Sequence, residues 1–160
     1  MDIIFTGLLL CLLVLFFQDW KYRSIHMVLP ILIFLSSYYI IRQENKLSNK
    51  IMILNLCFFL ITLSILILYM SLKNKRFLNP FQNYFGLGDL LFYISVTPLF
   101  NLKNYILFFI LSMIFAICLQ FTLRKKMKHK TVPLAGFSAL FLFIILAMDG
   151  LLSIPKISLL

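Results

Sequence analysis

Two aspartates, Asp19 and Asp89, are the residues of this sequence best placed to do chemistry. Asp19 follows a long apolar run, and Asp89 comes directly after the segment Gly86-Leu87-Gly88 at the start of another run. Two carboxyl groups in one partly dehydrated pocket cannot easily both be charged, so one is protonated while the other is ionised. The ionised member can accept a proton from an attacking water, and the protonated member can donate one to a carbonyl oxygen or a leaving amine. Such a pair could hydrolyse a peptide bond.

The composition of the whole chain indicates a membrane protein. Of its 160 residues, 62% are hydrophobic and 12% are charged, whereas soluble domains have about 45–50% apolar and about 25% charged residues. The few glycines, prolines and cysteines exclude a collagen, a disordered tail and a disulfide-rich secreted domain. Ionisable groups are costly at membrane depth and usually functional there. Function is therefore to be sought among the five acidic residues, which are Asp2, Asp19, Glu44, Asp89 and Asp149.

Six apolar runs predict an all-α, polytopic membrane protein of about six transmembrane helices in a single domain covering residues 1–160. Crossing the hydrocarbon core takes about 20 residues per helix, so six spans nearly fill the chain. Strands are not expected, because lipid does not tolerate an open sheet edge and the runs lack the alternation of a barrel. The first run lacks a basic region and a small-residue cleavage site, so we expect it to remain as a span. The runs are Ile3–Phe17, Met27–Ile41, Ile51–Leu72, Phe85–Phe100, Tyr105–Leu123 and Leu134–Leu152.

The basic residues predict how these spans are oriented. With six spans, ten Lys and Arg residues fall in the first, third and fifth loops, and five fall on the opposite side. Cytoplasmic loops carry the Lys/Arg excess, so we expect these three loops in the cytoplasm and both termini outside. Topology and attraction to anionic membrane lipid then explain the net charge of +10. Nucleic acid is not an expected partner.

This topology brings only Asp19 and Asp89 to a similar depth. Asp19 ends the first span on the cytoplasmic side, and Asp89 begins the fourth span, which re-enters from that side. Glu44 falls in the second loop, whereas Asp2 and Asp149 belong near the outer face. The predicted orientation therefore selects one pair from the five acids.

Gly86 and Gly88 distinguish the surroundings of Asp89. Glycine permits unusual backbone angles and the close approach of another segment. A helix that begins there would direct free N–H groups and its positive end toward the carboxylate. The fourth run is also short and contains Pro98, which suits a tilted or partly embedded helix.

The two aspartates also admit roles that involve no peptide hydrolysis. Asp19 could be an interfacial residue paired with Arg23, a contact worth only a few tenths of a kcal/mol when exposed. Asp89 and its glycines on the same side favour catalysis, with Arg23 steering acidic groups or orienting the loop. The main rival function is a small transporter or channel component that uses the acids for ion or proton binding. It would need polar residues along the spans, of which the chain has few: Asn55, Thr62, Ser64, Ser112 and Gln120.

Three motifs resemble those of the type IV prepilin peptidases, which are intramembrane aspartic peptidases of the GxGD type. The second aspartate motif of that family is matched by Gly86-Leu87-Gly88-Asp89. Its first motif, an Asp followed four residues later by Arg and then a hydrophobic residue, is matched by Asp19-Trp20-Lys21-Tyr22-Arg23-Ser24-Ile25. The third family motif is a basic residue before an Ile-Pro or Val-Pro step that opens the last span. The segment Lys130-Thr131-Val132-Pro133-Leu134-Ala135-Gly136 resembles it. The order and spacing agree over essentially the whole chain.

The resemblance implies that Asp19 and Asp89 are the catalytic pair and that Gly86, Gly88 and Arg23 shape the site or bind substrate. It implies a peptidase of the bacterial inner membrane with its active site toward the cytoplasm. Its partners would be prepilin-like or pseudopilin-like precursors of type IV pilus assembly and protein secretion, from which it would remove a short basic leader. No metal, nucleotide or organic cofactor is expected.

The chain departs from the family pattern in three places. Many members have a soluble cysteine-bearing insert and N-methylate the new terminus, whereas Cys11, Cys57 and Cys118 fall singly within predicted spans. No C-x-x-C pair is present to hold zinc, so we expect a minimal form with peptidase activity alone. His26-Met27 stand where the family often has Pro-Asn, and Leu91 where it often has Lys. These departures bear on substrate preference and leave both carboxylates in place.

Overall fold

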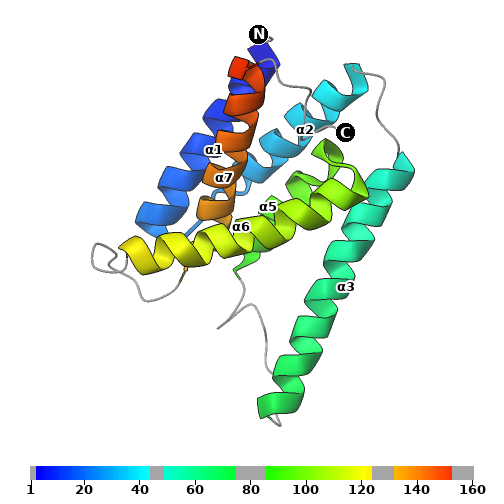
Figure 1. Cartoon of the computed structure of the whole chain (residues 1–160), viewed down its shortest axis with the longest axis vertical. Coiled ribbons are helices and arrows are strands. Elements are labelled where there is room, and N and C mark those ends of the chain that lie inside the picture. Colours follow the sequence, from blue (N-terminus) through cyan, green and yellow to red (C-terminus); the bar gives the residue numbers. More distant parts are fainter. Residues whose placement is uncertain (1–2, 44–48, 75–85, 124–131, 153–160) are drawn as a thin grey trace.

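The computed structural model describes residues 3–43, 49–74, 86–123 and 132–152. Within these ranges the chain forms six α-helices and one 3₁₀-helix and has no strand, which confirms the expected all-α fold. In chain order (Figure 1), the elements are α1 (Ile3–Tyr22), α2 (Val28–Gln43), α3 (Asn49–Asn74), α5 (Leu87–Ser95), η1 (Thr97–Leu99), α6 (Leu102–Leu123) and α7 (Leu134–Leu152).

An α-helix forms at each predicted apolar run, and two of the helices, α1 and α5, end five residues away from the predicted end. α1 continues beyond Phe17 to Tyr22, so Asp19 lies inside its last turn. The fourth run is divided, because α5 ends at Ser95 and Pro98 lies in the 3₁₀-helix η1. Proline has no N–H group with which to continue an α-helix. The short α5 is therefore a separate element that can be placed independently of the chain that follows it.

Three of the described helices, α1, α3 and α6, are long and apolar enough to cross a membrane. A helix of 20 residues, the length of α1, extends about 30 Å, which matches the hydrocarbon core. The other apolar helices are shorter in their described parts. The predicted number of spans and the orientation of the termini stay predictions. Asp2, Glu44 and most basic residues of the third and fifth predicted loops lie outside the described residues.

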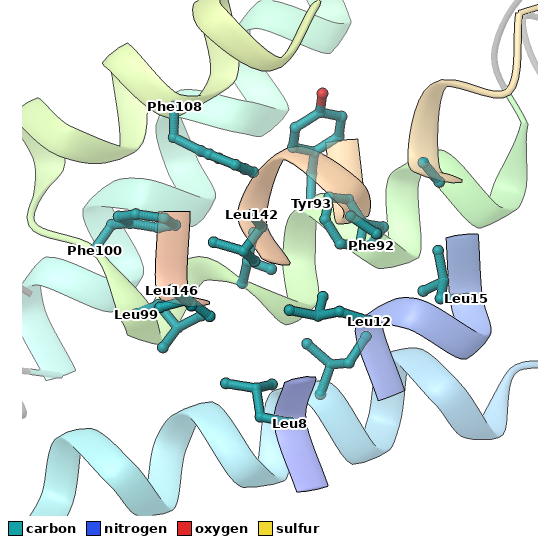
Figure 2. Packing of buried hydrophobic residues seen from close by; sticks show 14 of the residues in the cluster. Leu8, Leu12, Leu15, Phe92, Tyr93, Leu99, Phe100, Phe108, Leu142 and Leu146 are labelled. Atoms are coloured by element: carbon teal, nitrogen blue, oxygen red, sulfur yellow. The ribbon is translucent and has the colours of Figure 1, made fainter. Parts of the chain in front are cut away.

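The core forms where α1, α5 and α7 converge, and α6 packs on α7. Leu8, Leu12 and Leu15 recur along one face of α1 and are fully buried. Figure 2 shows them facing side chains of α5 and α7, among them Leu142. Asp19 follows Leu15 by four residues and continues the same buried stripe. The packing of the leucines therefore sets the rotation of α1 that turns Asp19 inward.

Asn55 connects α3 to the end of α5. Its side-chain amide donates hydrogen bonds to the carbonyl oxygens of Thr97, at 3.0 Å, and Phe100, at 2.7 Å. These carbonyls lie where Pro98 interrupts the helical ladder, and a buried carbonyl without a donor is costly. Asn55 is itself fully buried. Figure 1 shows α3 leaning away from the other helices toward its C-terminal end. Asn55 lies near the other end of this long and largely exposed helix.

Replacing Asn55 by Leu removes both donors and keeps the branching and the number of heavy atoms of the side chain. We expect the free energy of unfolding to fall by about 1–3 kcal/mol, because two buried carbonyls lose their partner. Thermal unfolding in detergent measures the change. Thr62→Val on the same helix is the matched control, since Thr62 Oγ1 donates to the Phe59 carbonyl of its own helix at 2.8 Å. Equal stability of the two variants would contradict this role of Asn55.

Candidate active site

Asp19 reaches the interior from the last turn of α1, where its side chain is buried. The C-terminal end of a helix dipole disfavours an anion, so the carboxylate needs stabilisation from elsewhere. It receives this from α7, whose Gly136 N–H donates to Asp19 Oδ2 at 2.7 Å. A Cβ on Gly136 would lie 3.0 Å from both the Cβ and the Oδ2 of Asp19. Glycine at position 136 therefore permits the close approach of α1 to α7.

Asp89 lies between the N-termini of two helices. It belongs to the first turn of α5, and its Oδ2 accepts a hydrogen bond from the N–H of Gly86, just before that helix, at 3.0 Å. Its Oδ1 accepts a hydrogen bond from the N–H of Ala135 in α7 at 2.7 Å. A helix N-terminus offers unpaired N–H groups and a positive partial charge. Two helices therefore stabilise this carboxylate from different sides.

The first turn of α7 brings the two carboxylates together. The helical ladder of α7 begins at the carbonyl of Pro133, so the N–H groups of Ala135 and Gly136 have no acceptor within the helix. These consecutive N–H groups donate to Asp89 and Asp19, respectively. The two carboxylates also interact electrostatically. The structure thus unites the two acids that the predicted topology pairs.

Arg23 follows the end of α1, and its charge interacts with both Asp19 and Asp89. Burial lowers the pKa of its guanidinium, whereas the two carboxylates act to raise it, and the group stays charged at neutral pH. Its Nη2 atom is buried and has no hydrogen-bond partner among the described residues. Its φ of 55° is left-handed, a conformation that residues other than glycine rarely adopt. Such strain occurs most often at functional sites.

Gly88 lets the segment after α1 touch the start of α5. A Cβ on Gly88 would lie 2.6 Å from Cδ1 and 3.1 Å from Cγ1 of Ile25. None of the glycines that the structure describes has a positive φ, so Gly86 and Gly88 do not use the unusual backbone angles that glycine permits. The close approach expected of this segment is present instead. Through Ile25 and Gly88, the two aspartate motifs contact each other directly.

Two contributions to the site do not follow from the sequence pattern. The main-chain N–H groups of Ala135 and Gly136 hold the carboxylates, whereas the sequence places these residues only in a motif at the start of the last span. The sequence feature that could have indicated these donors is Pro133, because proline is common where a helix begins. In addition, Gln18 Oε1 accepts the N–H of His26 at 3.0 Å and fixes the segment between α1 and α2.

The remaining described acid, Asp149, is distant from the pair. It lies near the other end of α7, 14 residues after Ala135, which corresponds to roughly 21 Å along a helix. Asp2 and Glu44 fall outside the described ranges. In the part of the chain that the structure describes, no three His, Cys, Asp or Glu side chains gather into a metal site.

Comparison with protein families identifies the group to which the chain belongs. The model of the type IV leader peptidase family matches residues 6–121, which include both aspartate motifs. The chain belongs to the type IV leader peptidase family. This confirms the resemblance inferred from Asp19, Asp89 and their neighbours, and it supports a peptidase. The matched region ends before α7, so the N–H donors of Ala135 and Gly136 lie outside it. No curated protein and no solved structure gives a significant match.

Gly88→Ala tests the contact between the two motifs. The new Cβ would overlap Ile25, so we expect the free energy of unfolding to fall by about 1–3 kcal/mol. Ile25→Ala in the same chain removes the overlapping atoms and should restore part of the loss, as thermal unfolding of the single and double variants would measure. Gly7→Ala is the control, because a Cβ there meets nothing within 4 Å. Strictly additive effects at positions 88 and 25 would contradict the contact.

Proposed function

We propose that this protein is an aspartic endopeptidase that removes the short basic leader from prepilin-like or pseudopilin-like precursors. The observation that carries the proposal is the placement of both motif carboxylates on consecutive N–H groups of one helix, in a chain of the type IV leader peptidase family. Asp19 and Asp89 are the proposed catalytic residues. The proposed location is the cytoplasmic boundary of the bacterial inner membrane.

The proposed reaction divides base and acid work between Asp19 and Asp89. Two adjacent carboxylates repel each other, so the pair holds one proton that belongs to both. The ionised carboxyl accepts a proton from a water whose oxygen attacks the scissile carbonyl carbon, while the other carboxyl protonates the carbonyl oxygen. The newly protonated carboxyl then donates to the leaving nitrogen as the C–N bond breaks, and a hydroxyl group of the intermediate returns its proton to the other carboxyl, which restores the pair. The products are a leader with a free carboxylate and a mature chain with a free amine.

The hydrogen bonds of the site suit this division of work. Asp89 uses both of its oxygens on main-chain N–H groups, whereas Asp19 uses Oδ2 on Gly136. Oδ1 of Asp19 accepts no bond from the described residues, so we assign to it the position of the attacking water. The unpartnered Nη2 of Arg23 can donate to a substrate carbonyl oxygen. Arg23 would thereby stabilise negative charge that develops on that oxygen.

The position of the pair suits a substrate that is partly within the membrane. Asp19 lies at the end of α1, an apolar helix long enough to cross, and Asp89 lies at the start of α5. Both acids are thus near a membrane boundary, where water has access. The predicted excess of basic loop residues assigns this boundary to the cytoplasm, on which side the precursor's leader is made.

The polar residues of the helices give the transporter alternative less support than the proposed peptidase has. Thr62 and Ser64 donate to carbonyl groups of their own helix. Asn55 bonds the chain around η1, and Ser112 bonds Tyr93. These four side chains are engaged within the protein, whereas the buried Oε1 of Gln120, the fifth polar span residue, has no hydrogen-bond partner among the described residues. A transport path would need several such unengaged side chains along the spans.

Asp19→Asn and Asp89→Asn should each reduce leader removal by about 10²–10⁴-fold, because each loses a group that transfers a proton. The test is co-expression with candidate precursors, followed by mass measurement of the precursor N-termini. Both variants should still accumulate in the membrane, since the amide oxygen can accept the Gly136 bond in Asp19→Asn and one of the two N–H bonds in Asp89→Asn.

Asp149→Asn is the matched control and should cleave at the normal rate. Normal cleavage by either Asp19→Asn or Asp89→Asn would refute the two-carboxyl mechanism. Ion or proton flux through reconstituted protein that depends on Asp89, without cleavage of any precursor, would instead establish the transporter alternative.

Arg23→Gly separates the backbone strain at this position from the charge of the side chain. Glycine adopts a positive φ without strain, which offsets part of the stability lost with the Arg23 charge beside the two carboxylates, so the free energy of unfolding should change by less than about 1 kcal/mol. Leader removal should nevertheless fall by about 10–100-fold, the loss expected for one hydrogen bond to a charged group. Thermal unfolding and the cleavage rate are both measured. Cleavage at the wild-type rate would show that Arg23 only shapes the loop.

A further inference from the structure

A buried hydroxyl network lies one helical turn from the proposed catalytic pair. Tyr93, four residues after Asp89 on α5, is fully buried. Its hydroxyl oxygen lies 2.9 Å from Ser112 Oγ of α6 and 2.9 Å from Ser138 Oγ of α7. Figure 2 shows Tyr93 within the packed cluster, with its hydroxyl oxygen at the end of the ring away from Phe92. One hydroxyl group thus connects three helices.

The direction of these hydrogen bonds follows from the number of available hydrogens. Ser112 Oγ donates to the carbonyl oxygen of Phe109 at 3.0 Å, and a hydroxyl group has only one hydrogen to donate. Tyr93 must therefore donate to Ser112, and Ser138 must donate to Tyr93. The network runs from α7 through α5 to α6 with each hydroxyl hydrogen used once.

The network provides a second link between the two helices that meet at the candidate active site. Asp89 accepts from Ala135 at one point, and Tyr93 accepts from Ser138 at the other. Asp89 and Tyr93 are four residues apart on α5, and Ala135 and Ser138 are three residues apart on α7. On each helix the two residues therefore lie on the same face. Two links one turn apart fix both the separation and the rotation of α5 relative to α7. A single link would let α5 pivot.

We propose that Tyr93 is a positioning residue for Asp89, acting through the hydrogen bonds of its hydroxyl group to Ser138 and Ser112. The catalytic part of this inference rests on the proposed function. α5 has only nine residues, and so short a helix is not stable without tertiary contacts. Tyr105 of α6 adds support by donating to the Tyr93 carbonyl at 3.0 Å. The position of Asp89 therefore depends on what holds Tyr93.

Tyr93→Phe removes the hydroxyl group and retains the ring. The ring of Tyr93 packs against those of Phe59 and Phe109, with centroids 5.5 and 5.0 Å apart, and phenylalanine can keep these contacts. The variant therefore tests the hydrogen bonds with little change in apolar packing. Ser95→Ala is the matched control on α5, because Ser95 is buried but donates to the Phe92 carbonyl of the same helix at 2.7 Å.

The experiment combines cleavage kinetics with the amide signals of protein labelled with 15N-alanine. Tyr93→Phe should lower kcat about tenfold, the size of effect that interhelical hydroxyl bonds in membranes produce. KM should change little, because the residue does not contact substrate. The chain has four alanines, and the Ala135 signal is assigned by its loss in Ala135→Gly. The Ala135 amide proton, bonded to Asp89, should move upfield in Tyr93→Phe and stay in place in Ser95→Ala.

Ser138→Ala should reproduce the effect of Tyr93→Phe, and the double variant should be no worse than either single one. This second variant also keeps the proposal testable if Tyr93→Phe fails to fold. Unchanged kcat and an unchanged Ala135 signal in a folded Tyr93→Phe would overturn the positioning role while the proposed function stands. Failure of the wild type to cleave any precursor would overturn the proposed function, and the Ala135 signal would still decide whether Tyr93 positions Asp89.

Discussion

The constraint on which this structure depends is the hydrogen bonding of two carboxylates by consecutive N–H groups at one helix end. Two acids of like charge are unfavourable in a largely apolar bundle unless donors and positive charge surround them. The start of α7 supplies the donors to Asp19 and Asp89, and Arg23 supplies the charge. α1 must then end, and α5 and α7 must begin, at the same point. Gly136 suits this position because a Cβ there would lie 3.0 Å from the Cβ and Oδ2 of Asp19, and Asp19 would have to shift.

The remainder of the bundle holds these three helix ends in place. The leucine stripe of α1 fixes the rotation that turns Asp19 inward, and Gly136 in the first turn of α7 lets α1 approach α7 closely. α5 is too short to hold its own position, so other helices hold it. Asn55 binds the chain that follows its C-terminus, and Tyr93 in its second half is bonded to α6 and α7. Apolar packing is not directional, so it does not determine the position of α5 by itself. The hydrogen bonds of polar side chains determine it.

The sequence predicted the helices and the acid pair, because both depend on patterns of residue type. Long apolar runs predict helices in lipid, and the loop charges place Asp19 and Asp89 at one end of the bundle without any comparison of their motifs with a family. Other features of the site cannot be predicted from patterns of residue type. Main-chain donors such as the Ala135 N–H are present in every residue except proline, and the left-handed backbone of Arg23 follows from its surroundings. Tyr93 in an apolar run is indistinguishable by type from a residue that only packs.

The most direct test of the account is the response of the two α7 amides to the two acids. Protein labelled with both 15N-alanine and 15N-glycine would be compared as wild type, Asp19→Asn and Asp89→Asn. Because a bond to a charged carboxylate is shorter and stronger than one to a neutral amide, Asp19→Asn should move chiefly the Gly136 proton and Asp89→Asn chiefly the Ala135 proton. If the amide proton shifts of Ala135 and Gly136 stay the same in both variants, the proposed arrangement of the site is contradicted.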